Sequence, residues 1–322
     1  MAEINRRRFI KESLALSAGG ALAAGMGDGR TAADGDKPVV QTVPPYPTGK
    51  IGNLQVSRLI MGSNLITYYA HSRDLNYVSN LARHYNTEDK IMETLRIGEQ
   101  NGINTIAIHS GEDFKRFIAR HRKEGGKLQW MIGVECGGNQ LGDYEYVIGD
   151  VVERGAAALY LHGNASEKLF NAGKLDMIPQ VIEAMRKTKL PVGVGCHDLR
   201  VVELCEKNKY PFDYYVKTFH HHKYGSAPRP DQIKGPHSEN PGYWCKNPEE
   251  TIELMKNCEK AWVAFKVMAA GAIQPKDAFK YVYENGADHI LAGMFDFQVA
   301  EDAQIGRGIL ADLKQRARPW RS

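Results

Sequence analysis

The sequence predicts a (β/α)8 TIM barrel, and two observations lead to this fold class. Short apolar or β-branched runs alternate with longer amphipathic segments eight times between residues 49 and 322. No GxGxxG motif follows a predicted strand, which argues against an open doubly wound sheet. Eight βα units in about 270 residues match the usual size of one such barrel.

Each predicted strand is a short apolar run, and each predicted helix has an amphipathic pattern. In chain order the strands are Val56–Gly62, Thr105–His109, Gln129–Glu135, Ala158–His162, Pro191–His197, Asp213–Phe219, Trp262–Met268 and His289–Gly293. The helices between them include Thr87–Asn101, Glu112–Lys123, Met177–Thr188, Leu199–Lys207, Pro248–Lys260, Lys276–Glu284 and Gln298–Arg316. Asn247 and Pro248 are typical of a helix start, and Gly102 and Gly286 stand where helix C-caps are expected.

The N-terminal residues 1–33 predict a twin-arginine export signal. The run from Asn5 to Lys11 places Arg6, Arg7 and Phe9 in the order of that signal, and a short, weakly apolar stretch follows it. Cleavage after Ala23 or Ala33 fits a small-residue rule, and an uncleaved membrane tether is the alternative. We therefore expect the twin-arginine translocase as a partner and a periplasmic or extracellular location.

Composition and charge indicate the domain boundaries and limit the further binding partners to be expected. Residues 34–48 are polar and rich in proline, which predicts a linker to a barrel domain at residues 49–322. The net charge is only +4, so no nucleic-acid partner is expected, and the basic segment Lys314–Arg321 is interpreted as a solvated end. Five cysteines without a CxxC pair argue against a disulfide framework. A small-molecule substrate is the expected partner.

Polar residues stand at the ends of the second to sixth predicted strands, the end at which TIM barrels build their active sites. They are His109, Glu135, His162, His197 and the run His220-His221-His222. Residues two apart share one face of a strand, and small residues stand two positions before His109, Glu135 and His197. This spacing predicts that the polar ends point into the mouth of the barrel.

Three imidazoles and one carboxylate at one mouth predict a divalent metal site. The expected ligands are Glu135, His162, His197 and either His220 or His222, a set that suits Zn, Mn, Fe or Ni. Such a metal could polarise a carbonyl group or lower the pKa of a bound water. The alternative is that each histidine is hydrogen-bonded, lines a wet pocket and binds no metal.

Further candidate residues lie on the connections at the same end. The long segment Ser63–Asn86 carries Tyr68, Tyr69 and Arg73, which are predicted to hold the substrate. Lys266 is an isolated charge in the predicted seventh strand, where burial without a partner is costly. It could bind a substrate carboxylate, act as a base or pair with Glu135.

Four segments resemble the aldo-keto reductases. Gly49–Gly52 with Leu54–Leu59 is similar to the family's opening hairpin and first strand, and Gly102–Thr105 to the entry of its second strand. Leu159–His162 resembles the fourth strand and Ile290–Met294 the eighth, so the resemblance covers about residues 49–304. It implies a barrel with an Asp, Tyr, Lys and His site around NADP(H).

The resemblance extends to only one of those four site residues. His162 matches the family's histidine, whereas Ala107 stands at the Asp position and no Tyr follows before Phe114. The Lys position falls near Val134 or Glu135. Without the Tyr acid, protonation of a carbonyl oxygen during hydride transfer has no obvious donor.

Three hypotheses follow. The leading one is an exported enzyme with an altered, metal-assisted site that acts on a sugar or hydroxy acid as an isomerase, lyase or hydrolase. In it, His162 contacts the metal or the reacting oxygens, and His109 or Lys266 moves the proton. The second is an NADP(H)-dependent oxidoreductase whose cofactor is bound tightly before export. The third is a non-catalytic barrel that binds a ligand.

Overall fold

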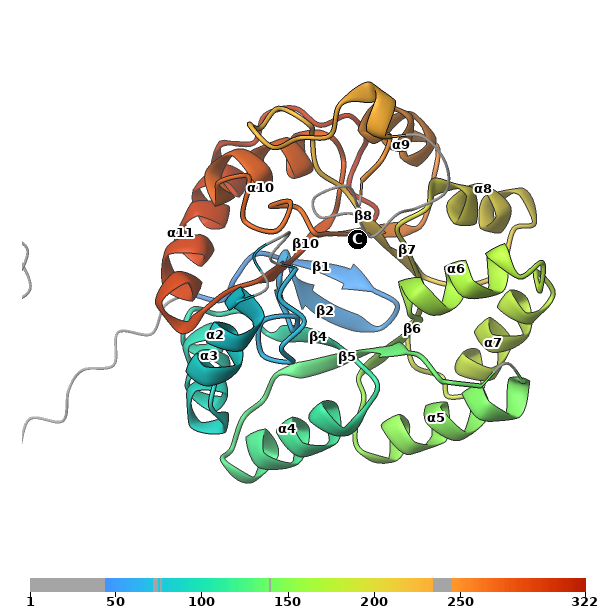
Figure 1. Ribbon diagram of the computed structural model, residues 1–322, viewed down its shortest axis with the longest axis horizontal. Helices are drawn as coiled ribbons and strands as arrows, with labels where there is room; N and C mark the ends of the chain where they lie inside the picture. Colours follow the sequence, from blue (N-terminus) through green and yellow to red (C-terminus); the bar gives the residue numbers. More distant parts are fainter. Residues whose placement is uncertain (1–43, 72–74, 76, 139, 234–244) are drawn as a thin grey trace, which may run out of the picture. The chain divides into compact units, whose positions relative to one another are not determined.

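The computed structural model describes residues 44–71, 75, 77–138, 140–233 and 245–322. In this part of the chain, eight parallel strands close into a barrel and helices surround it, which confirms the predicted TIM barrel (Figure 1). The predicted signal at residues 1–33 lies outside the described residues. Within the described residues, no helix is both long and apolar enough to cross a membrane.

The barrel strands follow one another around the barrel in chain order, and the last strand pairs with the first. They are β3 (Leu59–Gly62), β4 (Thr105–His109), β5 (Gln129–Val134), β6 (Ala158–Leu161), β7 (Val192–Cys196), β8 (Tyr214–Thr218), β9 (Ala261–Phe265) and β10 (His289–Gly293). Two further strands, β1 (Thr48–Ile51) and β2 (Leu54–Ser57), form an antiparallel hairpin. The single strand predicted at Val56–Gly62 is thus wrong, since it divides at Arg58.

The helices follow the strands as the sequence pattern predicts, with three additions. They are α2 (Tyr77–Tyr85), α3 (Glu88–Gln100), α4 (Glu112–Lys123), α5 (Leu141–Glu153), α6 (Gly163–Asn171), α7 (Met177–Arg186), α8 (Leu199–Lys207), α9 (Pro248–Lys256), α10 (Pro275–Glu284) and α11 (Asp296–Asp312), with a short 3-10 helix at Pro230–Gln232. Helices α2, α5 and α6 were not predicted. Glycines weaken the helical pattern of α5 and α6, whereas α2 leaves Leu81 exposed rather than packing it inward.

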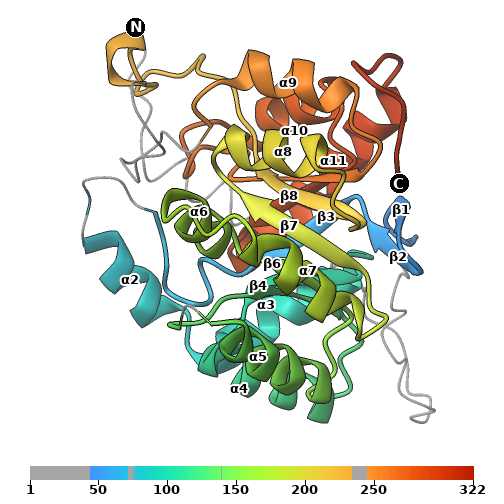
Figure 2. The ribbon, with the colours of Figure 1, turned by 90° about the vertical axis from the view of Figure 1, so that its right-hand side faces the viewer.

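The barrel interior is a small apolar core that the hairpin closes at one end. Ile60, Met131 and Val216 point inward, and Ile51 and Val56 of the hairpin pack beneath them. Figure 2 shows the hairpin at one end of the barrel and α2 at the opposite end. The end near α2 is therefore the open mouth, toward which the carboxyl ends of the strands point.

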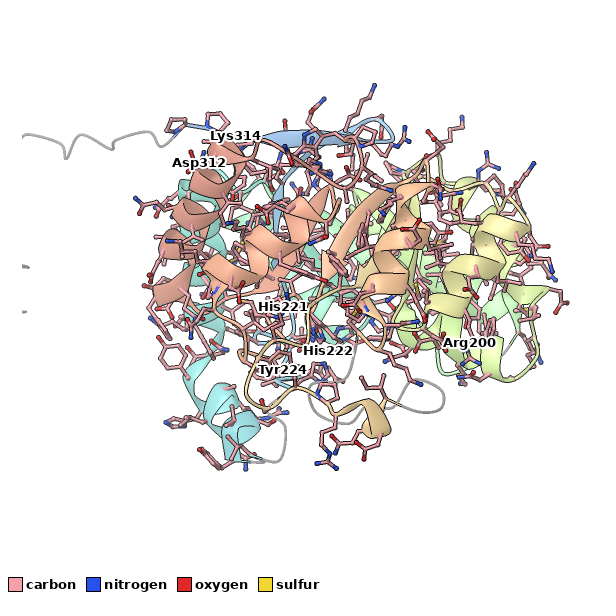
Figure 3. The ribbon with its side chains drawn as sticks, turned by 90° about the horizontal axis from the view of Figure 1, so that it is seen from above. Arg200, His221, His222, Tyr224, Asp312 and Lys314 are labelled. Atoms are coloured by element: carbon pink, nitrogen blue, oxygen red, sulfur yellow. The ribbon has the colours of Figure 1, made fainter. Side chains whose placement is uncertain are left out.

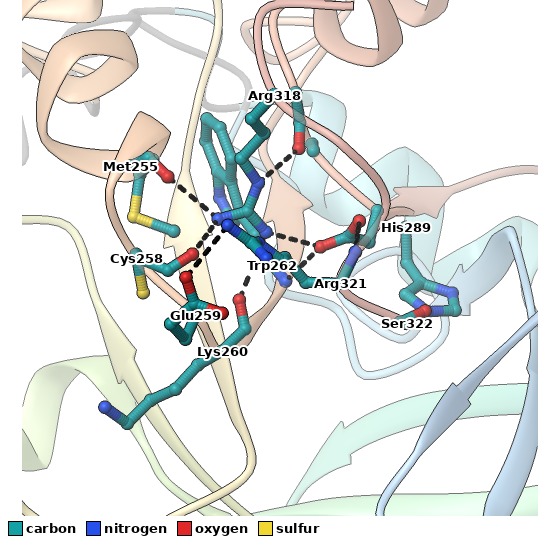
Figure 4. Close-up of polar contacts among 12 residues, drawn as sticks. Met255, Cys258, Glu259, Lys260, Trp262, His289, Arg318, Arg321 and Ser322 are labelled. Carbon is teal, nitrogen blue, oxygen red and sulfur yellow. Dashed lines mark hydrogen bonds and ion pairs between the residues drawn. The ribbon is translucent and has the colours of Figure 1, made fainter.

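The segment after α11 packs on the barrel through Arg318 and the side chain of Arg316, although most of its other residues are exposed, so it is more than the solvated end predicted for it. Asp288 is fully buried at the amino end of β10, and its carboxylate contacts Arg318 at 2.6 Å and Arg316 at 3.4 Å. Arg318 also donates hydrogen bonds to the carbonyl oxygens of Met255 and Cys258 (Figure 4). A buried carboxylate needs such partners, so this long-range pairing draws the basic segment onto the barrel.

Candidate active site

His162 and Glu135 form a pair at the mouth of the barrel. Each residue directly follows its strand, β6 or β5, and the pairing of Val134 with Leu161 places the two side by side. The Nδ1 atom of His162 lies 2.9 Å from Oε2 of Glu135. The contact with His162 lowers the pKa of the Glu135 carboxyl, so it is ionised at neutral pH. Because a carboxylate only accepts hydrogen bonds, this contact favours a proton on Nδ1.

His109 ends β4 beside this pair. Its ring centroid lies 6.5 Å from that of His162 and 5.3 Å from that of Tyr69, whose edge meets it at 80°. Burial lowers the pKa of His109, and the neighbouring His162 lowers it further. His109 is therefore a neutral imidazole at neutral pH. The predicted inward direction of His109 and Glu135 agrees with these contacts.

The buried phenol of Tyr160 lies below His162 on the same face of β6. The two ring centroids are 6.3 Å apart. A Cβ atom added at Gly133 would stand 2.8 Å from the Tyr160 hydroxyl oxygen, so the glycine makes room for the phenol. Burial raises the pKa of Tyr160, and the nearby Glu135 charge adds to the effect. Tyr160 thus stays protonated, as a hydrogen-bond donor or acid requires.

The predicted metal ligands do not converge. His197 faces the Glu167 carboxylate, with 3.3 Å between Nδ1 and Oε2. His220 uses both ring nitrogens, since Nδ1 donates to the His221 carbonyl at 3.0 Å and Nε2 accepts from the Cys245 amide at 3.3 Å. Among the described residues, no group of three or more His, Cys, Asp or Glu side chains is placed to hold a metal ion. The expected metal set therefore does not fit this arrangement.

The ring of His222, the third histidine of the run, also hydrogen-bonds within the protein. Its Nε2 atom lies 2.6 Å from the carbonyl oxygen of Cys245, while Nε2 of His221 lies 3.1 Å from Oδ2 of Asp277. Figure 3 shows His221, His222 and Tyr224 on the side of the barrel that carries α2. The run thus lies at the mouth, but its imidazoles form hydrogen bonds within the protein that hold the segment after β8 in place.

Of the predicted substrate residues that the structure describes, Tyr69 packs against His109 and Tyr68 does not. The hydroxyl of Tyr68 donates to the carbonyl of Asn86 at 3.1 Å, and the Arg83 guanidinium lies 4.6 Å above the Tyr68 ring. Tyr68 therefore holds α2 in place. Arg73 lies outside the described residues. Asp198 caps α8 by accepting a hydrogen bond from the Arg200 amide.

Lys266 lies beyond the end of β9, which corrects its predicted position inside a strand. The strand stops at Phe265, and Lys266 has a φ of 57°. This left-handed conformation is strained for a residue with a side chain and recurs at functional sites. Desolvation by neighbouring groups, and the positive charge of the nearby Lys266, lower the pKa of His71 to about 4, although the residue is exposed at its surface.

Solved structures support the resemblance at the level of the fold. An aldo-keto reductase structure from Pseudomonas aeruginosa superposes with a TM-score of 0.56 at 15% identity, over 85% of this chain and 100% of that one. A holo-form aldo-keto reductase from Bacillus halodurans gives 0.52 at 13% identity, over 85% and 98%. The fold is similar to that of the aldo-keto reductases. No protein-family model matches the chain, and no curated protein sequence does either.

A dehydrogenase shares this architecture. The glycerol dehydrogenase of Gluconobacter oxydans superposes with a TM-score of 0.51 at 11% identity, over 82% of this chain and 95% of that one. Such low identities establish a shared fold and leave the chemistry to the site itself. Two site residues, Tyr160 and Glu167, were missed from the sequence. Tyr160 stands two positions before His162 and is detectable by that spacing, whereas Glu167 lies on the unpredicted helix α6.

Proposed function

We propose that this chain is an enzyme that moves protons on a small hydroxy-carbonyl compound, a sugar or a hydroxy acid, as an isomerase or lyase. The observation that carries the proposal is the His162–Glu135 pair beside the neutral His109. An imidazole oriented by a carboxylate is a common general base, and a second imidazole within reach supplies a hydrogen-bond donor.

The proposed reaction uses the two histidines at different atoms. With its Nδ1 proton directed at Glu135, the Nε2 atom of His162 accepts a proton from the carbon next to the substrate carbonyl. The electron pair moves to the carbonyl oxygen, and the N–H of neutral His109 stabilises the negative charge there. Transfer of the hydroxyl proton from the adjacent carbon's oxygen to the former carbonyl oxygen, with return of the abstracted proton to the former carbonyl carbon, gives the isomer. Expulsion of a β-leaving group from the same intermediate gives the lyase product.

The remaining residues of the mouth suit a polar substrate. Lys266 supplies positive charge for a substrate carboxylate, and the exposed ring of Tyr69 forms a wall beside His109. The protonated phenol of Tyr160 offers a hydrogen bond from below. These assignments extend the proposal and are tested with it.

A second candidate is an NADP(H)-dependent oxidoreductase, which the phenol of Tyr160 beside His162 and the shared fold favour. The residues present do not fit the site that the resemblance implies. Only His162 matches, and the acidic Glu135 stands near the position of the family's lysine. We therefore derive no hydride-transfer step. A non-catalytic ligand-binding barrel is the third candidate.

Solvent hydrogen exchange tests the proposal without knowledge of the product. The exported protein is incubated in D2O with separate aldoses, ketoses and hydroxy acids, and NMR follows deuterium incorporation next to the carbonyl. Exchange without added nucleotide supports the proposal. Tight binding of NADPH by fluorescence, with hydride transfer and no exchange, supports the oxidoreductase. Binding without either reaction supports the third candidate, and elemental analysis of the same sample measures any bound metal.

Export through the twin-arginine pathway is part of the proposal. It rests on the order of Arg6, Arg7 and Phe9 before a weakly apolar stretch. Replacement of both Arg6 and Arg7 by Lys is expected to leave the protein in the cytoplasm. Cell fractionation with immunoblotting measures this, and export of the double variant would contradict the proposal.

A further inference from the structure

A second imidazole–carboxylate pair lies at the same mouth, one strand further along the barrel. His197 directly follows β7, and its Nδ1 atom faces the Glu167 carboxylate at 3.3 Å. Glu167 lies on α6, the helix that begins immediately after His162. The side chains of His197 and Glu167 are only 7% and 8% exposed, against 24% and 37% for His162 and Glu135. The second pair is therefore the more deeply buried of the two.

Two backbone N–H groups and one ring nitrogen surround the Glu167 carboxylate. Its Oε1 atom accepts hydrogen bonds from the backbone amides of His197 and, at 2.7 Å, Asp198. Its Oε2 atom faces the His197 ring. The two amides donate to an oxygen that can only accept, and the same limit on Oε2 favours a proton on the Nδ1 atom that faces it. The backbone amides thus compensate the charge of this buried carboxylate.

The position of the His197 ring is further fixed by its neighbours. A Cβ atom on Gly163 would stand 3.2 Å from the Cε1 atom of His197, so the ring packs directly over this glycine. On another side, the ring centroid lies 5.2 Å from that of Phe265. His197 therefore has little freedom to turn its Nδ1 atom away from Glu167.

We propose that Glu167 is a positioning residue that holds His197 in the Nδ1–H tautomer, which makes Nε2 the proton-accepting nitrogen of a second acid–base group in the mouth. The inference rests on the proposed function, in which His162 is the first such group. His197 acts on a substrate hydroxyl or on the carbon next to the one that His162 deprotonates. A purely structural Glu167 would brace the turn between β7 and α8 without controlling the tautomer.

Nitrogen-15 NMR of the full chain, labelled at histidine, tests the tautomer directly. The His197 signals are assigned by their loss in His197→Asn. The native protein is expected to show a protonated Nδ1 and an unprotonated Nε2. In Glu167→Gln the side-chain oxygen still accepts from the backbone amides while the NH2 group faces Nδ1, so the tautomer is expected to switch to Nε2–H. Glu99→Gln, which alters a carboxylate beside His121, is the matched control and leaves His197 unchanged.

An Nε2–H tautomer in the native protein, or an unchanged tautomer in Glu167→Gln, overturns the assignment. The native spectrum decides this even where the variant fails to fold. The deuterium-exchange assay tests whether His197 takes part in the reaction. Glu167→Gln is expected to lower kcat about 100-fold with little change in KM. A switched tautomer with full activity removes His197 from the chemistry. A correct tautomer in a protein that exchanges no substrate hydrogen contradicts the proposed function instead.

Discussion

The Nδ1 atom of His162 and the Oε2 atom of Glu135 lie 2.9 Å apart on the two residues that directly follow neighbouring parallel strands. Their proximity follows from strand register, because residues at the ends of adjacent parallel strands meet at one edge. Both side chains remain partly exposed at the mouth. The pair is thus held in place by the barrel and still accessible to a small molecule.

Glu135→Gln is expected to lower kcat for solvent hydrogen exchange about 100-fold or more, because Nδ1 of His162 then faces an amide instead of a carboxylate. The KM should change little. Steady-state kinetics measure both constants. Glu145→Gln, on the exposed face of α5, is the control and should keep native activity.

Gly133→Ala tests the space that Tyr160 and His162 require. The added Cβ atom would stand 2.8 Å from the Tyr160 ring and 2.9 Å from Cδ2 of His162, so both rings must move. We expect a loss of activity and a cost of about 1–3 kcal/mol in the free energy of unfolding, measured by urea denaturation. Gly142→Ala, whose added Cβ atom meets no atom within 4 Å at an exposed position of helix α5, should instead stabilise the protein slightly. Equal effects at the two positions would contradict the assigned packing.

Asp288→Ala is expected to destabilise the fold strongly. Its removal leaves Arg316 and Arg318 as buried charges without their carboxylate, which costs about 3–5 kcal/mol in comparable cases. Chemical denaturation measures the loss. Asp312→Ala, at the exposed end of α11, should stay within about 0.5 kcal/mol of native. A small effect at Asp288 would mean that the basic segment contributes little to stability.

Stability should fall as the pH is lowered from about 6.5 toward 4, the window set by His289. Burial lowers the pKa of His289 to about 4, whereas the unfolded chain has the ordinary value of 6.5. Within this window the unfolded state binds a proton that the folded state excludes, so acid favours unfolding. His289→Gln should reduce the slope of unfolding free energy against pH by up to about 1.4 kcal/mol per unit. An unchanged slope would contradict the pKa shift.

The fold follows from local patterns, whereas much of the site depends on contacts between distant segments. The apolar runs and the histidines that end them were enough to predict the barrel and the mouth. The sequence offered Lys266 as the partner of Glu135, but the register of β5 and β6 brings His162 there instead. The positive φ of Lys266 has no local sequence signal, because non-glycine residues rarely adopt it.

The metal prediction is not supported by the described residues, for a similar reason. Residue type and strand position could place His220 and His222 near the mouth, but not orient their rings. Those orientations are set by the backbone of Cys245, more than twenty residues further along the chain. Glu167 could not be recognised from the sequence because helix α6, on which it lies, begins with the weak helix formers Gly163 and Asn164. The burial of Arg318 likewise depends on Asp288, thirty residues earlier.

The most direct test of the account compares deuterium incorporation by the native protein and by His162→Asn, with His84→Asn on the exposed face of α2 as the control. The substrate is the sugar or hydroxy acid that exchanges fastest with the native enzyme. The account predicts that His84→Asn keeps the native rate, whereas His162→Asn slows exchange about 100-fold or more while its fold is retained. Native exchange by a folded His162→Asn would contradict the central role of the His162–Glu135 pair.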